Sequence, residues 1–179
     1  MILDLVPNYD PVLHTPTPEF NLEEAPVNPV ELYKNLAETM LAKGGIGLAA
    51  PQCGLPYRFF VIRTDPIVGM FNCRIVDKSE QTLELEEGCL SVPGLIIKIK
   101  RSRIIKARWE ELIQKENGVS FETKTKVFSD LTARAIQHEL DHLNGTMFYD
   151  KISKFQLEML IKKNNKRNKI KYKLQDFKF

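Results

Sequence analysis

Gln137-His138-Glu139-Leu140-Asp141-His142 is the stretch from which the rest of the chain can be interpreted. It contains the pattern HExxH, and on an α-helix two histidines four residues apart lie on nearly the same face, close enough to hold one metal ion. Glu139 follows the first histidine, where a carboxylate can take a proton from a metal-bound water. The stretch therefore predicts a helix with His138 and His142 as metal ligands and Glu139 as a general base.

A tetrahedral catalytic site needs a third protein ligand and an open fourth position. The remaining histidine, His14, lies in a Pro-rich stretch with no ligand-like neighbour. Cys89 is the better candidate, because it lies in the polar, Gly-flanked segment 86–91 at the end of an alternating run. Each signal alone has a simpler interpretation: HExxH arises by chance on charged helices, and a single cysteine is more often a small buried hydrophobe.

A third segment, Gly44-Gly45-Ile46-Gly47-Leu48-Ala49-Ala50-Pro51-Gln52, carries few bulky side chains. Gly44 and Gly45 fit the end of a helix, but a helix cap does not explain the residues that follow. A segment of small residues lets another backbone approach closely, so an extended peptide could pair along it. Pro51 favours an extended residue before it, which orients Gln52, and a positioned amide near a metal can stabilise an oxyanion.

These segments together resemble a known family. GxGxAAPQ at 45–52, EGCLS at 87–91 and QHExDH at 137–142 are similar, in order and spacing, to the three motifs of peptide deformylases. The resemblance covers most of the chain, from about Pro7 to Asp150, and three ordered motifs are far more specific than HExxH alone. It implies a hydrolase of protein biosynthesis that removes the formyl group from N-formylmethionyl nascent polypeptides and releases formate.

The resemblance also implies a cofactor and a mechanism. Cys89, His138 and His142 are expected to hold iron(II), with zinc, nickel or cobalt as substitutes. A metal-bound water would attack the formyl carbon, with Glu139 first as general base and then as general acid toward the leaving amine.

Further residues would contact the substrate. The Gln52 side-chain amide and the Leu90 backbone N–H are expected to hold the oxyanion. Leu131 and Ala135 precede His138 by seven and three residues, so their periodicity also fits ordinary core packing. The residues expected to bind the formyl-methionyl peptide, through its side chain or its backbone, are Gly45, Ile46, Gly47, Gly88, Leu131 and Ala135.

Composition and cysteine usage agree with such an enzyme without identifying it. The 179 residues suffice for one domain, and 43% hydrophobic with 27% charged residues is typical of a soluble protein. Cys53, Cys73 and Cys89 form no disulfide-like framework, and a thiolate ligand suits a reducing compartment. The apolar run 1–7 is too short for a signal peptide, and no segment approaches a membrane span. A cytoplasmic location without membrane attachment is therefore expected.

The charge is divided unevenly along the chain. Residues 151–179 carry ten Lys/Arg and two Asp/Glu, whereas residues 1–150 carry a net charge of −5. We therefore predict a catalytic domain at 1–150 and a basic, helical C-terminal tail at 151–179. A basic run is most often a solvated helix face, but it also allows binding to ribosomal RNA.

The remaining pattern predicts an α+β fold. Asn28-Pro29-Val30-Glu31 has the residues of a helix start, followed by an apolar stripe of Leu32, Tyr33, Leu36, Ala37, Met40 and Leu41. An edge strand is expected at 1–6, and further β-prone runs lie at 57–62, 68–76, 82–85, 95–99, 104–109 and 120–127. Mixed or antiparallel sheets would surround a central HExxH helix that binds the metal, with an N-terminal helix and a helical tail.

Two alternatives come from other functional classes. A zinc endopeptidase also uses HExxH, but normally takes its third ligand downstream of the second histidine, where this chain offers Asp150, Glu158 and Asp176. A non-enzymatic ribosome- or RNA-binding protein would hold a structural metal with four protein ligands. Cleavage of internal peptide bonds would favour the first alternative, and a closed fourth position would favour the second.

Overall fold

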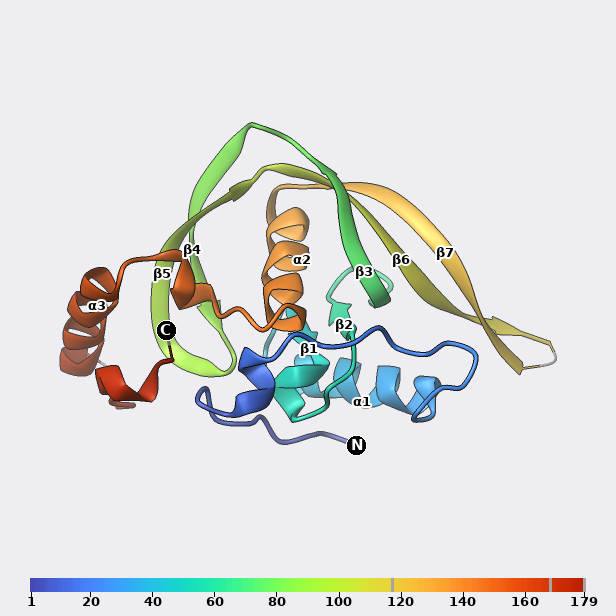
Figure 1. The fold of residues 1–179 in the computed structure, drawn as a ribbon, viewed down its shortest axis with the longest axis horizontal. Helices are drawn as coiled ribbons and strands as arrows, with labels where there is room; N and C mark the ends of the chain where they lie inside the picture. Colours follow the sequence, from blue (N-terminus) through green and yellow to red (C-terminus); the bar gives the residue numbers. More distant parts are fainter. Residues whose placement is uncertain (117, 168, 179) are drawn as a thin grey trace.

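The computed structural model describes residues 1–116, 118–167 and 169–178 (Figure 1). Their antiparallel sheets and helices confirm the α+β class. The α-helices are α1 (Pro29–Ala42), α2 (Asp130–Leu143) and α3 (Lys154–Arg167). The strands are β1 (Gly47–Ala49), β2 (Phe59–Ile62), β3 (Val68–Lys78), β4 (Thr82–Cys89), β5 (Val92–Ser102), β6 (Ile104–Lys115) and β7 (Gly118–Ser129).

The strands form two sheets. Five of them follow the order β1-β2-β3-β6-β7, and β4 pairs with β5 in a separate hairpin; every pairing is antiparallel. Figure 1 shows α2 enclosed between the β4–β5 hairpin and the larger sheet. One helix therefore faces both sheets, and residues on its different sides can meet side chains from each.

Helix α1 forms where the sequence predicts it. The Asn28 side chain accepts hydrogen bonds from the backbone N–H groups of Val30 and Glu31, which satisfies donors that the first helical turn leaves unpaired. Leu32, Leu36, Ala37 and Met40 are buried, as the apolar stripe predicts, and all but Ala37 lie in a cluster with residues of β1, β2 and β3. Leu41 is an exception, because it faces solvent at the end of the helix.

Helix α2 is held by its apolar side. Ala133, Ile136, Leu140 and Leu143 are buried against residues of β2, β3 and β6. The helix ends at Asn144 and Gly145, and Gly145 has a φ of +68°, which favours glycine. A Cβ at Gly145 would lie 2.9 Å from backbone atoms of the N-terminal segment, so this turn also allows the two segments to pack closely.

The predicted edge strand at 1–6 is absent, and β1 was not predicted. The predicted strands that correspond to β3, β4, β5, β6 and β7 are present but were predicted too short. Residues 1–6 form no strand, because their backbone N–H groups donate hydrogen bonds outside any sheet. The Leu3 N–H donates to the Thr39 side chain of α1, and the Val6 N–H donates to the Gln52 carbonyl. Strand β4 does not end at residue 85 but continues to Cys89, since the pairing with β5 extends as far as Val92. Cross-strand hydrogen bonds therefore support Cys89.

The C-terminal region packs against the rest of the molecule. Leu157 and Ile161 of α3 lie in a buried cluster with Cys89 and residues of β5, and Tyr172 and Phe177 belong to the same cluster. We call this set the β5 cluster. Figure 1 shows α3 beside β5. None of the described helices combines the length and the hydrophobicity that crossing a membrane requires.

Candidate metal centre

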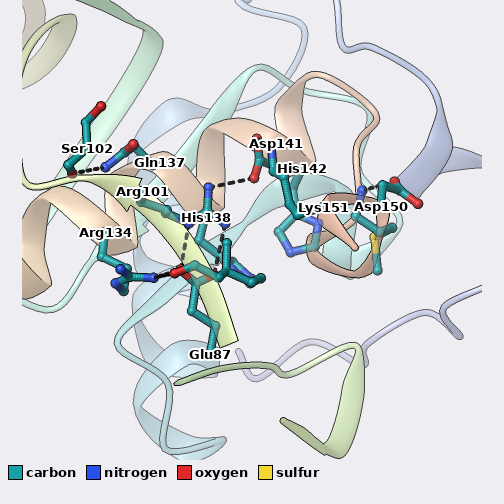
Figure 2. Close-up of polar contacts among 12 residues, drawn as sticks. Glu87, Arg101, Ser102, Arg134, Gln137, His138, Asp141, His142, Asp150 and Lys151 are labelled. Carbon is teal, nitrogen blue, oxygen red and sulfur yellow. Dashed lines mark hydrogen bonds and ion pairs between the residues drawn. The ribbon is translucent and has the colours of Figure 1, made fainter. Parts of the chain in front are cut away.

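Cys89, His138 and His142 come together at the centre of the molecule. Helix α2 presents both imidazoles on one side, and the end of β4 brings the thiol to them. One ligand atom from each residue lies within 4.8 Å of the other two, and Cys89 Sγ is 3.3 Å from His142 Nε2. Figure 2 shows the two histidines side by side on α2.

Glu139 lies on α2 between the two histidines, and its side chain is buried with few hydrogen-bond partners. Its side chain is 4% exposed, and its Oε2 atom has no hydrogen-bond partner among the described residues. Burial raises the pKa of Glu139 to about 7. A Cβ at Gly47 would lie 2.5 Å from Glu139 Oε1, so only glycine at this position of β1 leaves room for the carboxylate. The arrangement provides a buried group that can exchange a proton near neutral pH.

The Gln52 side chain is oriented by its own loop. Its Oε1 accepts a hydrogen bond from the Ala49 N–H at 2.9 Å, which leaves the amide nitrogen as the donor toward the centre. That nitrogen donates to Cys89 Sγ at 3.5 Å and to Ser91 Oγ at 3.2 Å. Gln52 is 2% exposed, so its amide is a positioned donor in a region shielded from water.

A carboxylate outside the ligand set orients His138. Glu87 Oε2 lies 3.1 Å from His138 Nδ1, so the Nε2 atom is the one available to a cation (Figure 2). Burial alone would raise the pKa of Glu87, but hydrogen bonds from His138 and Arg101 lower it to about 2. Burial lowers the pKa of His138, yet its hydrogen bonds with Cys89 and Glu87 outweigh burial and raise it to about 10, so a cation that binds Nε2 displaces a proton from it. Burial keeps the pKa of His142 well below its usual value.

Two arginines of this network were not identified from the sequence. Arg101 donates to both Glu87 oxygens, at 2.6 and 2.9 Å, and to Asp141 at 2.8 Å. Arg134 also donates to Glu87, and it reaches the carbonyls of Ile99 and Leu83. A signal existed for both: Arg101 continues the inward-facing positions of β5, and Arg134 lies one helical turn before His138.

A cavity of about 470 Å³ opens beside the centre. Its walls include the Gly-rich segment, the β4–β5 turn and the start of α2. Leu131 and Ile46 are 59% and 47% exposed, so they border the cavity opening and are not core residues. The sequence-derived site residues that line the cavity are Gly45, Ile46, Gly47, Gln52, Gly88, Cys89, Leu90, Leu131, Ala135, His138 and Glu139. Pro93, Gly94 and Arg134 line it too and were not predicted.

Other potential ligands lie elsewhere. His14 Nε2 lies 2.8 Å from the Asn8 carbonyl, so this imidazole is engaged in a hydrogen bond away from the centre. Asp150 accepts a hydrogen bond from the Met147 N–H, and Glu158 pairs with Lys162 on the surface of α3. Within the described parts of the chain, Cys89, His138 and His142 form the one cluster of potential ligands. The downstream carboxylate expected of a zinc endopeptidase is therefore not at the centre.

The donor set fits a divalent transition metal. A thiolate and two imidazoles suit iron(II), zinc, nickel and cobalt better than calcium or magnesium, which prefer oxygen. The convergence of three such atoms around the buried, unpaired Glu139 Oε2 is an arrangement that a cation and water would complete. Three protein ligands leave a coordination position for catalysis.

Comparisons of the sequence and of the structure with known proteins point to the same family. Residues 2–158 match the family model described as polypeptide deformylase. A peptide deformylase of Synechocystis sp. is 39% identical over 128 residues, which span 68% of this chain and 65% of that protein. One from Pseudothermotoga lettingae is 41% identical over 143 residues, or 80% and 78% of the two chains. A crystal structure of a peptide deformylase from Synechococcus elongatus in complex with actinonin has a TM-score of 0.78 at 31% identity, with 98% and 90% coverage.

Proposed function

The chain belongs to the polypeptide deformylase family, and we propose that it hydrolyses the N-terminal formyl group of nascent polypeptides and releases formate. It is an enzyme of protein biosynthesis and a peptide deformylase. The observation that carries the proposal is the convergence of Cys89, His138 and His142 with Glu139 beside one cavity. Helix α2 is then the central metal-binding helix, residues 1–150 hold all the catalytic residues, and 151–179 form the basic tail.

Iron(II) is the proposed cofactor, held by the Cys89 thiolate and one nitrogen each from His138 and His142, with zinc, nickel or cobalt as substitutes. When bound, such a cation supplies Lewis acidity, which acidifies water and polarises a carbonyl oxygen. Glu87 fixes the orientation of His138 through Nδ1, and such supporting contacts typically change metal affinity 10–100-fold.

The chain's own groups carry the proton and stabilise the charge. Glu139 takes the proton of the attacking water at its buried carboxylate and later delivers it to the leaving amine. The Gln52 amide nitrogen and the Leu90 backbone N–H hold the oxyanion that develops at the formyl oxygen. Since Ala49 already fixes the Gln52 amide, its nitrogen only has to exchange the long 3.5 Å contact with Cys89 Sγ for the oxyanion when this charge appears. The C–N bond then breaks to give formate and a free amino terminus.

The cavity provides the surfaces that contact the proposed substrate. Ile46, Leu131 and Ala135 provide an apolar surface for the methionine side chain, whose burial contributes on the order of 1.5–3 kcal/mol. Strand β1 is the terminal strand of its sheet, so an extended peptide can pair with Gly47 on one side and with Gly88 of β4 on the other. Gly45 packs closely against Leu90, since a Cβ there would lie 2.9 Å from Leu90 Cδ1.

The proposed substrate implies that the enzyme works on nascent chains at the ribosome. Formyl-methionyl nascent chains are proposed to be met at the ribosome, in the cytoplasm. The exposed lysines and arginine of the tail support contact with ribosomal RNA, because their charge is opposite to that of phosphate.

Anaerobic purification with metal analysis, followed by a formate-release assay on formyl-Met-Ala-Ser, tests the proposal. About one equivalent of metal and steady formate release are expected. Absence of release from metal-loaded protein, or cleavage of internal peptide bonds, would contradict it. With iron bound, activity should decay in air because an accessible iron–thiolate centre oxidises, whereas nickel- or cobalt-loaded protein should stay active. Air-stable activity in protein that contains only iron would argue against iron as the cofactor.

A further inference from the structure

The segment that follows α3 returns to the catalytic centre. It lies beyond residues 2–158, the part that matches the family model. Tyr172 and Phe177 are both buried in the β5 cluster, to which Cys89 also belongs. The Phe177 ring packs edge-on against Tyr149, with a centroid separation of 4.9 Å. The Asn8 side chain donates to the Asp176 carbonyl at 2.6 Å, which ties the segment to the N-terminal region.

Tyr172 is fixed at both its backbone and its hydroxyl. Asn165 of α3 accepts from the Tyr172 N–H at 2.9 Å and donates to the Tyr172 carbonyl at 2.7 Å. The Tyr172 hydroxyl donates to the Pro93 carbonyl at 2.9 Å. Burial raises the pKa of Tyr172 to about 12, so the hydroxyl keeps its proton at neutral pH.

Pro93 is the second residue of β5 and follows the turn at 90–91 that connects β4 to β5. Cys89 pairs with Val92 across this turn, and Pro93 lines the cavity together with Leu90. On the side of the Gly-rich segment, Gln52 donates to Ser91 Oγ at 3.2 Å. The turn and the start of β5 are therefore held at two points, at Ser91 by Gln52 and at Pro93 by Tyr172.

We propose that Tyr172 is a positioning residue for deformylation, which fixes Pro93 and thereby the wall of the substrate cavity next to Leu90. The inference rests on the proposed function. The hydroxyl contacts the wall and not the reacting atoms, while β4, which carries Cys89, also pairs with β5 from Thr82 to Glu87, well away from Pro93. Loss of this hydrogen bond therefore weakens substrate binding and leaves the chemical step and the metal in place.

The experiment compares Tyr172→Phe with wild type as full-length, metal-loaded protein. Formate release from formyl-Met-Ala-Ser should show a KM raised about fivefold, the factor that one neutral hydrogen bond is worth, with kcat within about twofold of wild type. The dissociation constant of the product Met-Ala-Ser, measured by calorimetry, should rise by the same factor. Metal content per chain should stay near the wild-type value, and the thermal midpoint should fall by only about 2–4 °C, because the same hydrogen bond also contributes to the fold.

Two further variants complete the design. Tyr9→Phe is the matched control, because it removes a hydroxyl from a residue that is 58% exposed, and no kinetic change is expected. Asn165→Ala removes both hydrogen bonds that hold the Tyr172 backbone, and it should raise KM in the same direction.

The outcomes separate this inference from the proposed function. If wild type releases no formate, the proposed function fails. If wild type is active and Tyr172→Phe has an unchanged KM and an unchanged dissociation constant, the positioning role is overturned. A fall in kcat that parallels loss of metal, with KM unchanged, would also overturn it, because Tyr172 would then support the metal ligands and not the cavity wall.

Discussion

Glu139 is the side chain on which the proposed chemistry depends most directly. Replacing it with glutamine preserves its shape but removes the proton acceptor. We expect Glu139→Gln to bind metal like wild type and to lose turnover by about 10²–10⁴-fold, the usual contribution of general acid–base catalysis. Formate release with parallel metal analysis measures both. Turnover near the wild-type value would exclude Glu139 as the base.

Gly47 controls the position of that carboxylate. Since a Cβ at Gly47 would lie 2.5 Å from Glu139 Oε1, Gly47→Ala must displace the catalytic group. Misplacement of about 1 Å can cost on the order of 10²-fold, so we expect a loss of that size in kcat with metal retained. The control is Gly118→Ala, where φ is +129° and no heavy atom lies within 4 Å of the added Cβ. It should lower only the unfolding free energy, and an equal kcat loss in both variants would refute the steric explanation.

At the scale of elements, the buried Glu87 joins β4, β5 and α2. It accepts hydrogen bonds from Arg101 of β5 and Arg134 of α2, and it orients His138 (Figure 2). Removing one partner of such a pair leaves a buried charge without compensation, which commonly costs about 3–5 kcal/mol. The three elements should therefore unfold together.

The network gives a specific pH dependence. Since the pKa of Glu87 is about 2 in the folded chain and near 4.5 when unfolded, its ionised form stabilises the fold fully above pH 4.5. That stabilisation, on the order of 3 kcal/mol, is lost as the pH falls through 2. Urea unfolding of metal-free protein between pH 6 and 2.5 should show a steeper decline for wild type than for Glu87→Gln. Parallel curves would mean that Glu87 contributes little to stability.

Helices were easier to predict than strands, for physical reasons. The cap at Asn28 and the HExxH pattern are local signals, so α1 and α2 could be placed from a few residues. The strands depend on distant partners: β4 reaches Cys89 only because β5 lies beside it. The three metal-ligand candidates could be named from motifs, whereas strand and helix periodicity could at most place Arg101 and Arg134 on inward-facing positions, because only tertiary packing brings them to Glu87.

At the scale of the whole molecule, residues 151–179 have two proposed roles. Their exposed basic side chains contact the ribosome, and Tyr172 positions the cavity wall. Deletion of the tail is unsuitable, since it would remove Tyr172 from the cavity wall. Reversing exposed charges at Lys163, Lys166 and Arg167 to glutamate leaves Tyr172 in place. We expect weaker ribosome binding with a smaller salt dependence, because fewer phosphate contacts release fewer counterions. Activity on a short formyl peptide should be unchanged.

The control for this test reverses the same number of charges elsewhere. Lys34, Lys78 and Lys106 are exposed and lie on α1 and the larger sheet. If the tail is the contact surface, this triple variant should bind ribosomes like wild type when sedimentation is measured over a range of salt concentrations. An equal loss in both variants would indicate attraction by overall charge alone.

The short terminal strand β1 also bears on solubility. An unpaired strand edge can recruit other copies of a chain and start fibril growth, and segments of six or seven β-prone residues are typical of such stacks. Strand β1 spans only Gly47–Ala49. Such a short edge offers a peptide only about two or three backbone hydrogen bonds, which is enough for transient binding but too few to start an amyloid fibril.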